Sequence, residues 1–511
     1  MCLATLLACL LVSSTPAPTV HTPRASISAA VQDAARKSGL PSGTYSIVLK
    51  NADTGETITA IEADRPMKPA SNMKLFSTGT ALMTLGTEFL FRTQLLREIL
   101  PAGDRLTVVG DGDPAFGDPD LLSKMSWTAQ NGEVRNGVDA TALVDIWVEA
   151  VRGEKITKIS ELVIDARIFD DVGYQPHWPR EQYSNGYCAE VWGLNFHANV
   201  VHVIPAPRAG GAPAIASMSP AMPWLVTSNK ATSRTGAKDK HTFTVVREPN
   251  SNALTLGGNA KVQPRDAAEL TLHDTPTLFG ELLADRLRKQ GVTVARVRKA
   301  LVGEPAAAGT QVGPVIQTPI ATVLKRANTE SSNLYAESLC KRAGAARTKT
   351  PGSWSNGTAT IAEAIQLRLG PSALSGFVVD DGSGLSAANR VTARVLCDWI
   401  VSFANDPKLA QPFIESMAEA GESGTVQKRF KDLAGSAVTV HCKTGYIRGT
   451  SCLSGIAIAP NGTRIAFSVL GNSLEQADRV DRAKRLQDAV VRAIHSALVE
   501  SSRNSVNALG G

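Results

Sequence analysis

The chain has 511 residues, of which 43% are hydrophobic and 20% are charged, so it is globular and long enough for two or more hydrophobic cores. Its net charge of +6 is modest for this length, and no dense run of Lys and Arg is interleaved with aromatic residues. These properties exclude nucleic acid as the expected partner. They fit an acidic polymer, a carboxylate-bearing substrate or simply a slightly basic surface.

An apolar segment over residues 3–12, followed by small residues and prolines, opens the chain. It is too short to span a bilayer and is typical of a secretory signal peptide, residues 1–17, cleaved near Ala17. We therefore expect a periplasmic or extracellular protein; a disordered tail is the alternative, because the usual positive n-region is missing. Residues 6–9 resemble a lipoprotein box, but the apolar run continues past Cys9, which argues against lipid attachment there. No other segment has the ~18 apolar residues of a membrane helix, so we expect a soluble chain with at most peripheral membrane association.

Five cysteines lie outside this N-terminal segment, at positions 188, 340, 397, 442 and 452. They lack the CxxC spacing of zinc sites, and a sparse, odd set predicts at most one or two disulfides. Cys442 and Cys452 flank a predicted hairpin turn, so a bridge between two facing strands is one expectation. Two buried free thiols are the alternative, which we prefer.

The first predicted elements are a helix over residues 27–38 and two alternating strands around a turn at 51–55. A helical stretch follows at 68–86, with Leu75, Ala81, Leu82 and Leu85 on its apolar face. Residues 92–270 then read as short strands separated by Gly, Pro and polar loops, including an exposed cationic loop at 227–241.

Helical patterns return from Thr275, and three strands follow late in the chain, with turns at residues 445–449 and 460–462. A final amphipathic helix is predicted from about residue 476 to 500. The simplest assembly is one discontinuous α/β (α+β) domain made of residues 25–92 and 271–511. Residues 93–270 form a β-rich inserted region within it.

Ser71 lies at the predicted start of a helix, directly after Pro69 and Ala70, and Lys74 follows one turn later on the same face. The free N–H groups and positive dipole of a helix start can stabilise an oxyanion beside Ser71. The same dipole, together with partial burial, would lower the pKa of Lys74 and make it a base for the serine proton. The alternative is an N-cap serine with a solvated lysine, because S-x-x-K arises by chance about once or twice in such a chain.

Two further motifs favour the catalytic interpretation. Ser331 and Asn333 begin a second predicted helix, and Lys443-Thr444-Gly445 ends a predicted strand before a hairpin. Each has an ordinary explanation, a helix cap and a turn. In this order, however, S-x-x-K, S-x-N and K-T-G form the active-serine set of penicillin-binding proteins and class A β-lactamases.

Longer landmarks extend the match: GDGDP (110–114), WGLNFHANVVHV (192–203), DDGSGLS (380–386) and GTVQKRF (424–430). With them, residues 28–498 resemble the D-alanyl-D-alanine carboxypeptidase/endopeptidase family of low-molecular-mass class C penicillin-binding proteins, peptidase family S13. The resemblance implies a serine β-lactamase/penicillin-binding-protein-like transpeptidase domain. It also implies a large insertion between the first two motifs.

The resemblance implies that Ser71 attacks a D-Ala-D-Ala or D-configured cross-link peptide bond and forms an acyl-enzyme, with Lys74 accepting its proton. Ser331 would relay a proton to the leaving amine, and Asn333 would orient Lys74 and the substrate amide. The implied partners are peptidoglycan peptides, with β-lactam antibiotics trapped as covalent inhibitors at Ser71.

The third motif would bind the end of the substrate. Lys443 and Thr444 would hold its terminal carboxylate, and Gly445 would allow close approach to the strand. The resemblance places the oxyanion hole at the backbone N–H groups of Ser71 and Tyr446. Tyr446 departs from the small hydroxyl residue common after K-T-G, so we expect it to narrow the pocket or change the preferred substrate.

Other departures and rival sites have smaller consequences. Ser332 replaces the usual Asp of the second motif, and we expect little damage from it. The histidines lack metal-ligand spacing, and Asp111 and Asp113 read as parts of a tight turn, so we expect neither a metal nor another cofactor. Two alternative functions remain: a β-lactamase-like or esterase hydrolase using the same serine, and a catalytically silent cell-wall binding protein.

Overall fold

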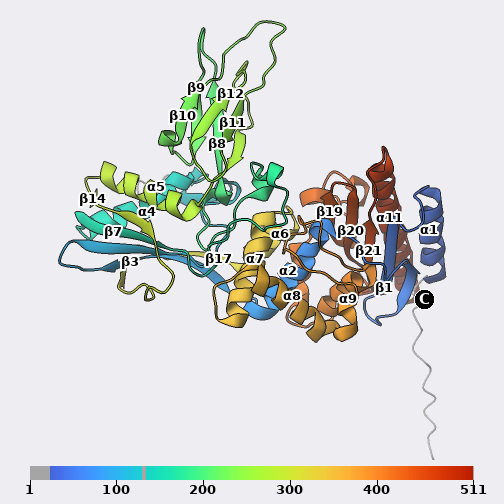
Figure 1. Cartoon of the computed structure of the whole chain (residues 1–511). Coiled ribbons are helices and arrows are strands. Elements are labelled where there is room, and N and C mark those ends of the chain that lie inside the picture. Colours follow the sequence, from blue (N-terminus) through green and yellow to red (C-terminus); the bar gives the residue numbers. More distant parts are fainter. Residues whose placement is uncertain (1–23, 129–133, 510–511) are drawn as a thin grey trace, which may run out of the picture.

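The computed structural model describes residues 24–128 and 134–509 (Figure 1). The predicted signal peptide at 1–17, and with it Cys9, lies outside the described residues. The helix predicted at 27–38 is confirmed as α1 (Arg24–Lys37), and the last predicted helix is α11 (Arg479–Leu509). None of the helices in the described ranges combines the length and apolar character needed to cross a bilayer.

A six-stranded antiparallel sheet joins the two ends of the chain. Its strands, in spatial order, are β18 (Ala418–Glu419), β19 (Thr439–Ile447), β20 (Thr450–Ile458), β21 (Arg464–Gly471), β1 (Tyr45–Asn51) and β2 (Thr57–Ile61). β1 pairs with β21 from Tyr45 opposite Gly471 onward, so segments from the N- and C-terminal parts of the chain share one sheet. Figure 1 shows α1 and α11 side by side against this sheet.

Side chains of β1 alternate between two hydrophobic cores, one on each face of the sheet. Ile47 and Leu49 belong to the core shared with α1 and α11, whereas Val48 between them belongs to the core on the opposite face. Successive side chains of a strand point to opposite faces, so a strand buried on both faces reads as a continuous apolar run. The helices of the second core are α2 (Met73–Leu85), α6 (Ile320–Asn328), α7 (Asn333–Thr348), α8 (Trp354–Leu369), α9 (Ala393–Ala404) and α10 (Ala410–Ser416).

The helix α2 lies in the middle of this helical layer and is buried on nearly every side. Residues all round the helix are buried because protein surrounds it, and the polar Lys74, Ser77 and Thr78 are among them. Gly79 lets the helix α9 pack closely against α2, because a Cβ at position 79 would lie 2.7 Å from the Trp399 side chain of α9. A short 3-10 turn, Ala70–Asn72, leads into α2 and packs against β19 and β20. The start of α2 is therefore fixed between the sheet and the helices.

The inserted region contains a seven-stranded sheet covered by two helices. The strands are β3 (Leu90–Glu98), β4 (Asp104–Val109), β7 (Lys158–Asp165), β14 (Thr293–Val294), β15 (Val297–Lys299), β16 (Thr310–Gln311) and β17 (Ile316–Pro319). The helices are α4 (Ala140–Gly153) and α5 (Thr275–Lys289). Since β14 and β15 pair with β7, and β16 and β17 with β3, the predicted boundary at residue 270 falls inside this unit, which continues to residue 319.

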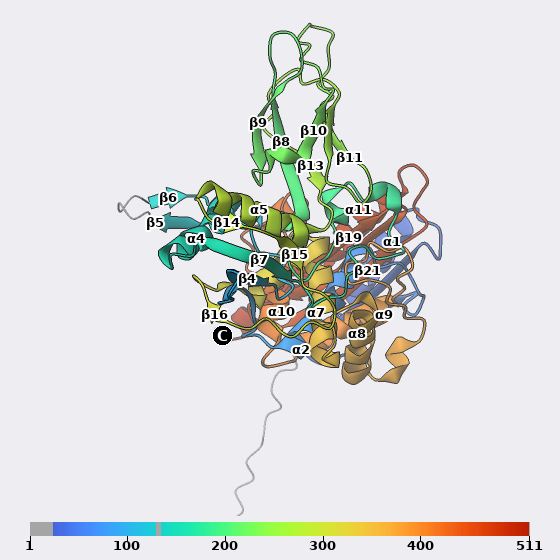
Figure 2. The same cartoon turned by 60° about the vertical axis from the view of Figure 1, so that its left-hand side comes forward.

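Shorter strands form a second part of the insertion, which projects from the rest of the molecule in both views (Figures 1 and 2). They are β8 (Val200–Ala206), β9 (Ala214–Ser219), β10 (Val226–Asn229), β11 (Thr244–Arg247), β12 (Leu254–Gly257) and β13 (Ala268–Thr271). A small hairpin, β5 (Ser126–Thr128) with β6 (Val134–Asn136), and a one-turn helix, α3 (Pro119–Leu122), complete the insertion. The polar loop predicted at 227–241 is mostly exposed, although it begins inside β10.

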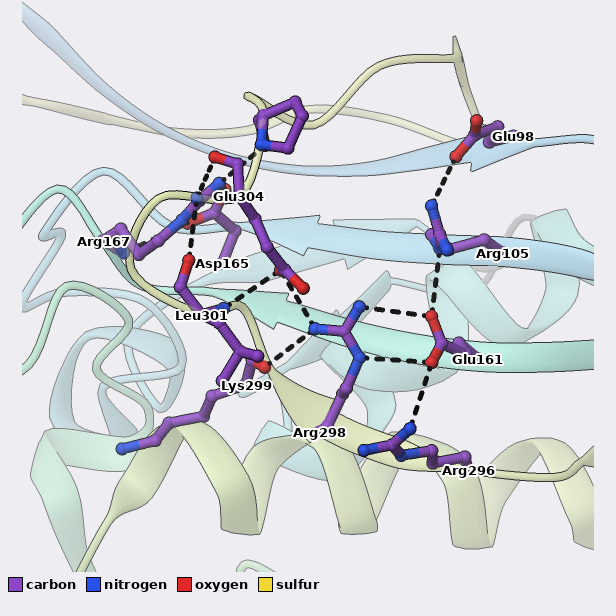
Figure 3. Close-up of polar contacts among 11 residues, drawn as sticks. Glu98, Arg105, Glu161, Asp165, Arg167, Arg296, Arg298, Lys299, Leu301 and Glu304 are labelled. Atoms are coloured by element: carbon purple, nitrogen blue, oxygen red, sulfur yellow. Dashed lines mark hydrogen bonds and ion pairs between the residues drawn. The ribbon is translucent and has the colours of Figure 1, made fainter.

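Charged side chains bind a surface segment, residues 300–308, to the seven-stranded sheet (Figure 3). Glu161 lies 3.1 Å from Arg105 Nε and 3.2 Å from Arg298 Nη2. Arg167 donates hydrogen bonds to three carbonyl groups of the segment, among them that of Glu304 at 2.6 Å. Because these groups satisfy one another, we assign the network to the stability of the insertion.

All five cysteines of the described residues are buried and free. The bridge expected between Cys442 and Cys452 is wrong, because the β19–β20 register places Cys442 opposite Gly455 and Cys452 opposite Gly445. The hairpin turn is two residues long, which offsets the two cysteines by three positions along the pair.

The buried thiols lead to a testable prediction. Burial raises the pKa of Cys188, Cys442 and Cys452 to about 12, so neither thiolate formation nor reagent access is favoured. We expect the folded protein carrying Cys2→Ser and Cys9→Ser to show no thiol that reacts with Ellman's reagent within minutes. The same protein unfolded without reductant should show all five thiols. Fewer thiols in the unfolded protein would establish a disulfide and contradict the prediction.

Candidate active site

Ser71 and Lys74 meet at the start of α2. Ser71 lies in the 3-10 turn and is partly exposed, whereas Lys74 is in the first turn of α2 and has no solvent-exposed surface. The Nζ atom of Lys74 lies 2.9 Å from Ser71 Oγ, 2.6 Å from Asn333 Oδ1 and 2.8 Å from the carbonyl oxygen of Ser383. The amine is therefore held by three oxygen atoms.

Burial lowers the pKa of Lys74 to about 7, while the buried carboxylates of Glu337 and Asp381 oppose part of that change. An amine with this pKa is neutral in a large fraction of molecules near pH 7. A neutral amine next to a serine hydroxyl can accept its proton, and a general base works best when its pKa is near the operating pH.

The second motif lies beside the first. Ser331 has a positive φ of 63°, and α7 starts two residues later at Asn333. This backbone conformation puts Ser331 Oγ 2.8 Å from Lys443 Nζ, and Asn333 Nδ2 donates to the carbonyl oxygen of Tyr187 at 2.8 Å. Asn333 thus bonds Lys74 through its oxygen and the insertion through its nitrogen.

The third motif is the central part of β19. Lys443 has no solvent-exposed surface, and burial, followed by the charge of Lys74, lowers its pKa well below the ordinary value. Its neighbour Thr444 donates a hydrogen bond to Thr425 Oγ1 at 2.8 Å. All three motifs therefore line one site, although residues 71 and 443 lie in opposite halves of the chain.

Gly445 allows β19 to run against the start of α2. A Cβ at this position would lie 2.7 Å from the carbonyl oxygen of Pro69 and 3.1 Å from the backbone nitrogen of Ser71. Asn72 Nδ2 also donates to the carbonyl oxygen of Lys443 at 2.9 Å. The backbone nitrogen of Ser71 thus lies next to the strand that carries Tyr446, and the oxyanion hole formed by these two residues stays a prediction.

The Tyr446 side chain is 62% exposed, and its ring lies 5.8 Å from Lys484 Nζ of α11. An exposed ring beside a surface lysine does not fill a pocket floor. We expect Tyr446→Thr to change the second-order rate of acylation by penicillin less than about threefold, as is usual for surface changes. Stopped-flow measurement with a fluorescent penicillin checks this, and a tenfold change would restore the expectation that Tyr446 shapes the pocket.

A buried loop outside the three motifs completes the surroundings of Lys74. Ser383 contributes its carbonyl oxygen, and Glu337 of α7 accepts hydrogen bonds from the backbone N–H groups of Gly382 and Ser383. The segment 380–386 was recognisable as a family landmark. Glu337 carried no separate sequence signal, because a single acidic residue in a helix usually faces solvent.

The Asp pair of the GDGDP segment lies outside this site. Asp111 pairs with Arg342 at 3.0 Å, and Asp113 accepts from Thr318 Oγ1 at 2.6 Å and from the backbone N–H of Ala115 at 2.8 Å. Burial raises the pKa of Asp113 to about 6. Within residues 24–128 and 134–509, no group of three or more His, Cys, Asp or Glu side chains has an arrangement that could hold a metal ion.

Comparison with known proteins agrees with the motifs. The model of the D-Ala-D-Ala carboxypeptidase 3 (S13) family matches residues 27–493. The D-alanyl-D-alanine carboxypeptidase of Actinomadura sp. (strain R39) is 31% identical over 474 residues, covering 88% of this chain and 80% of that protein. The D-alanyl-D-alanine carboxypeptidase DacB of Haemophilus influenzae is 23% identical over 481 residues, covering 92% of both chains.

Solved structures establish the fold. The crystal structure of penicillin binding protein 4 (dacB) from Haemophilus influenzae superposes with a TM-score of 0.68 at 21% identity, covering 89% of this chain and 97% of that chain. The same protein complexed with a β-lactam gives a TM-score of 0.63. The predicted transpeptidase domain of penicillin-binding-protein type is thereby confirmed. Together with the family match over most of the chain, this shows that the protein belongs to the D-Ala-D-Ala carboxypeptidase 3 (S13) family.

Proposed function

We propose that this protein is a serine-type D-Ala-D-Ala carboxypeptidase that also cleaves D-configured cross-links in peptidoglycan, and that β-lactams inhibit it. The observation that carries the proposal is the fully buried Lys74 amine 2.9 Å from Ser71 Oγ, in a chain of the S13 family. The names of the relatives support the same activity, and a β-lactam complex of one of them supports inhibition.

The reaction follows from the contacts. Neutral Lys74 removes the Ser71 hydroxyl proton as Oγ attacks the carbonyl carbon of the penultimate D-Ala, and the negative charge on the carbonyl oxygen is taken up by the Ser71 and Tyr446 N–H groups. The proton that Lys74 has taken is relayed by Ser331, which is hydrogen-bonded to Lys443, to the leaving amine as the C–N bond breaks, so Lys74 is neutral again in the acyl-enzyme. Water then adds to the ester, the Ser71 ester bond breaks, and Ser71 regains its proton.

The substrate carboxylate has a suitable partner in the third motif. Lys443, which is buried, and Thr444, which is partly exposed, are neighbours on β19, and Gly445 brings this strand against the start of α2 that carries Ser71. A protonated lysine and a hydroxyl group bind a carboxylate through charge-assisted hydrogen bonds, and a carboxylate beside Lys443 favours the protonated form that burial disfavours. A terminal D-Ala carboxylate fits this description, whereas a cross-link substrate places a neighbouring carboxyl group there.

Localisation is part of the same proposal. Peptidoglycan lies outside the cytoplasmic membrane, and the apolar segment at residues 3–12 is typical of a signal peptide. We therefore propose a periplasmic or extracellular enzyme, with peripheral association to the membrane. Cell fractionation with an antibody against the protein tests this, and a cytoplasmic pool of the processed chain would oppose it.

Incubation with labelled penicillin G and with a diacyl-D-Ala-D-Ala peptide tests the activity. We expect one stable adduct per molecule, located by mass spectrometry on the peptide that contains Ser71, and release of D-alanine that stops after exposure to penicillin. Rapid turnover of penicillin would favour the β-lactamase alternative. Neither adduct nor D-alanine release would leave the catalytically silent cell-wall protein.

A further inference from the structure

We propose that Glu337 is a positioning residue for the catalytic base. Its carboxylate holds the Ser383 peptide so that the Ser383 carbonyl group binds Lys74 Nζ and leaves the amine lone pair directed at Ser71. The inference rests on the proposed function, in which Lys74 takes the proton of Ser71. It assigns to α7 a role beyond presenting Ser331 and Asn333.

The three partners of Lys74 are not equivalent. Asn333 Oδ1 and the Ser383 carbonyl oxygen can only accept hydrogen bonds, whereas the Ser71 hydroxyl can also donate. A neutral amine has two N–H bonds and one lone pair. With its two hydrogens directed to Asn333 and Ser383 at 2.6 and 2.8 Å, the lone pair faces Ser71 Oγ at 2.9 Å. Without the Ser383 carbonyl, one hydrogen would be free to turn toward Ser71.

Glu337 fixes the Ser383 carbonyl group by binding the backbone N–H groups of the same loop. One carboxylate oxygen accepts from the Ser383 N–H at 2.8 Å, and the other accepts from the Gly382 N–H at 2.9 Å and from Trp354 Nε1 at 2.8 Å. Gly382 is packed so tightly that a Cβ would lie 2.7 Å from Cys340. The loop therefore cannot shift without breaking these bonds.

The helix α7 contributes both constraints. Asn333 and Glu337 are four residues apart, so they lie on the same face one turn from each other. Asn333 reaches Lys74 directly, and Glu337 reaches it through the Ser383 peptide. A single rigid element thereby sets the positions of the two acceptors that orient the amine.

Burying the Glu337 carboxylate costs free energy of desolvation, so a glutamate without hydrogen-bond partners would be unfavourable at this position. It has no solvent-exposed surface, and burial together with the nearby Asp381 raises its pKa to about 7. Within the described residues it forms no ion pair, and its three donors are the two loop amides and one indole. Three hydrogen bonds from neutral donors offset the desolvation of the carboxylate only while the loop stays in place.

The charge of Glu337 adds a second signature. The charged groups that influence Lys74 are Glu337 on α7 and Asp381 in the loop, which favour its protonated form. The charge of Lys74 in turn lowers the pKa of Lys443 on β19. Glu337, whose own pKa is about 7, carries its carboxylate charge over the upper part of the acidic limb, and removing the charge therefore lowers the pKa of Lys74 there. A variant that lacks this charge should reach its acylation plateau at a lower pH than the wild type.

Glu337→Gln tests both consequences, with Glu190→Gln as the matched control. Glu190 is also buried and accepts from an indole, Trp192 Nε1 at 2.8 Å, and from a backbone amide, but it pairs with His273 at 2.7 Å and lies in the insertion. Second-order acylation by a fluorescent penicillin is measured from pH 5 to 10. We expect E337Q to lower the plateau rate roughly 10- to 100-fold and to move the acidic limb down by roughly one pH unit. E190Q should keep the wild-type rate and limb.

An E337Q rate within threefold of the wild type would overturn the proposal. So would a reduced rate with a limb that stays in place or moves upward, because a purely structural loss leaves the base unchanged. If E337Q fails to fold, E337D retains the charge but withdraws the acceptor from Ser383. It should lose rate with a wild-type limb, and a wild-type rate would overturn the proposal. If penicillin does not acylate the wild type, the proposed function itself is contradicted. If the wild type is acylated and E337Q reacts equally fast, only the positioning role of Glu337 is contradicted.

Discussion

Replacing Ser71 with alanine is expected to abolish both the penicillin adduct and D-alanine release. The acyl-enzyme requires the Ser71 oxygen, and no other hydroxyl contacts the Lys74 amine among the described residues. We expect the rate of D-alanine release to fall by at least roughly 10⁴-fold, as found when a catalytic serine is removed. A gel assay with fluorescent penicillin and an enzymatic assay for D-alanine measure the two effects.

Ser332→Ala provides the matched control. Ser332 precedes α7, and its side chain forms no capping hydrogen bond with the helix. We expect the rate of adduct formation by S332A to stay within about twofold of the wild-type rate, since surface side chains without a structural contact have small effects when replaced. Adduct formation by S71A at the wild-type level would show that another residue is acylated and would contradict the assignment of Ser71.

The three motifs were predictable because each combines residue types whose chemistry depends on local position. Ser71 and Lys74 are three residues apart at a helix start, and Gly445 ends a motif on a strand so near this start that a Cβ at Gly445 would lie 3.1 Å from the Ser71 nitrogen. Such features follow from short-range geometry, so the order of motifs indicated the pocket. The structure brings these residues together as that order implied, and their individual roles await the experiments.

The role of Glu337 was not predictable in the same way. Its importance depends on a loop that folds back so that the amide of Ser383, 46 residues further along the chain, reaches the carboxylate. Neither helical spacing nor composition predicts a contact between residues so far apart in the sequence. The short motif S-x-N ends four residues before Glu337, so motif comparison stops before the residue that fixes the loop.

The limits of the insertion were misplaced for a related reason. The segment from α5 to β17 shows the same alternation of helical and strand patterns as the catalytic domain, yet its strands complete the sheet of β3 and β7. The helix α4 was also missed, although Val144, Trp147, Val148 and Val151 have helical spacing. Strand pairing over more than a hundred residues decides which domain a segment joins, and local patterns do not encode it.

Replacing Lys74 is expected to have the second-largest effect, because the serine loses its base while the pocket keeps its shape. We expect Lys74→Ala to reduce acylation by penicillin about 10³-fold, within the range for loss of a general base. Lys74→Arg should be equally inactive up to pH 10, since a guanidinium group stays protonated and cannot accept the serine proton. Stopped-flow acylation measurements separate both variants from the wild type.

The pH dependence of the wild type gives an independent test of the same residue. Below its pKa of about 7 Lys74 is protonated and cannot take the Ser71 proton, so acylation should rise with pH through that value and reach a plateau above it. Lys50→Gln is the control, because Lys50 pairs with Asp398 at a distance from the site and should leave the profile unchanged. A wild-type rate that falls between pH 6 and 8 would mean that the charged lysine is the active form, and the proton would then have to leave Ser71 by another route.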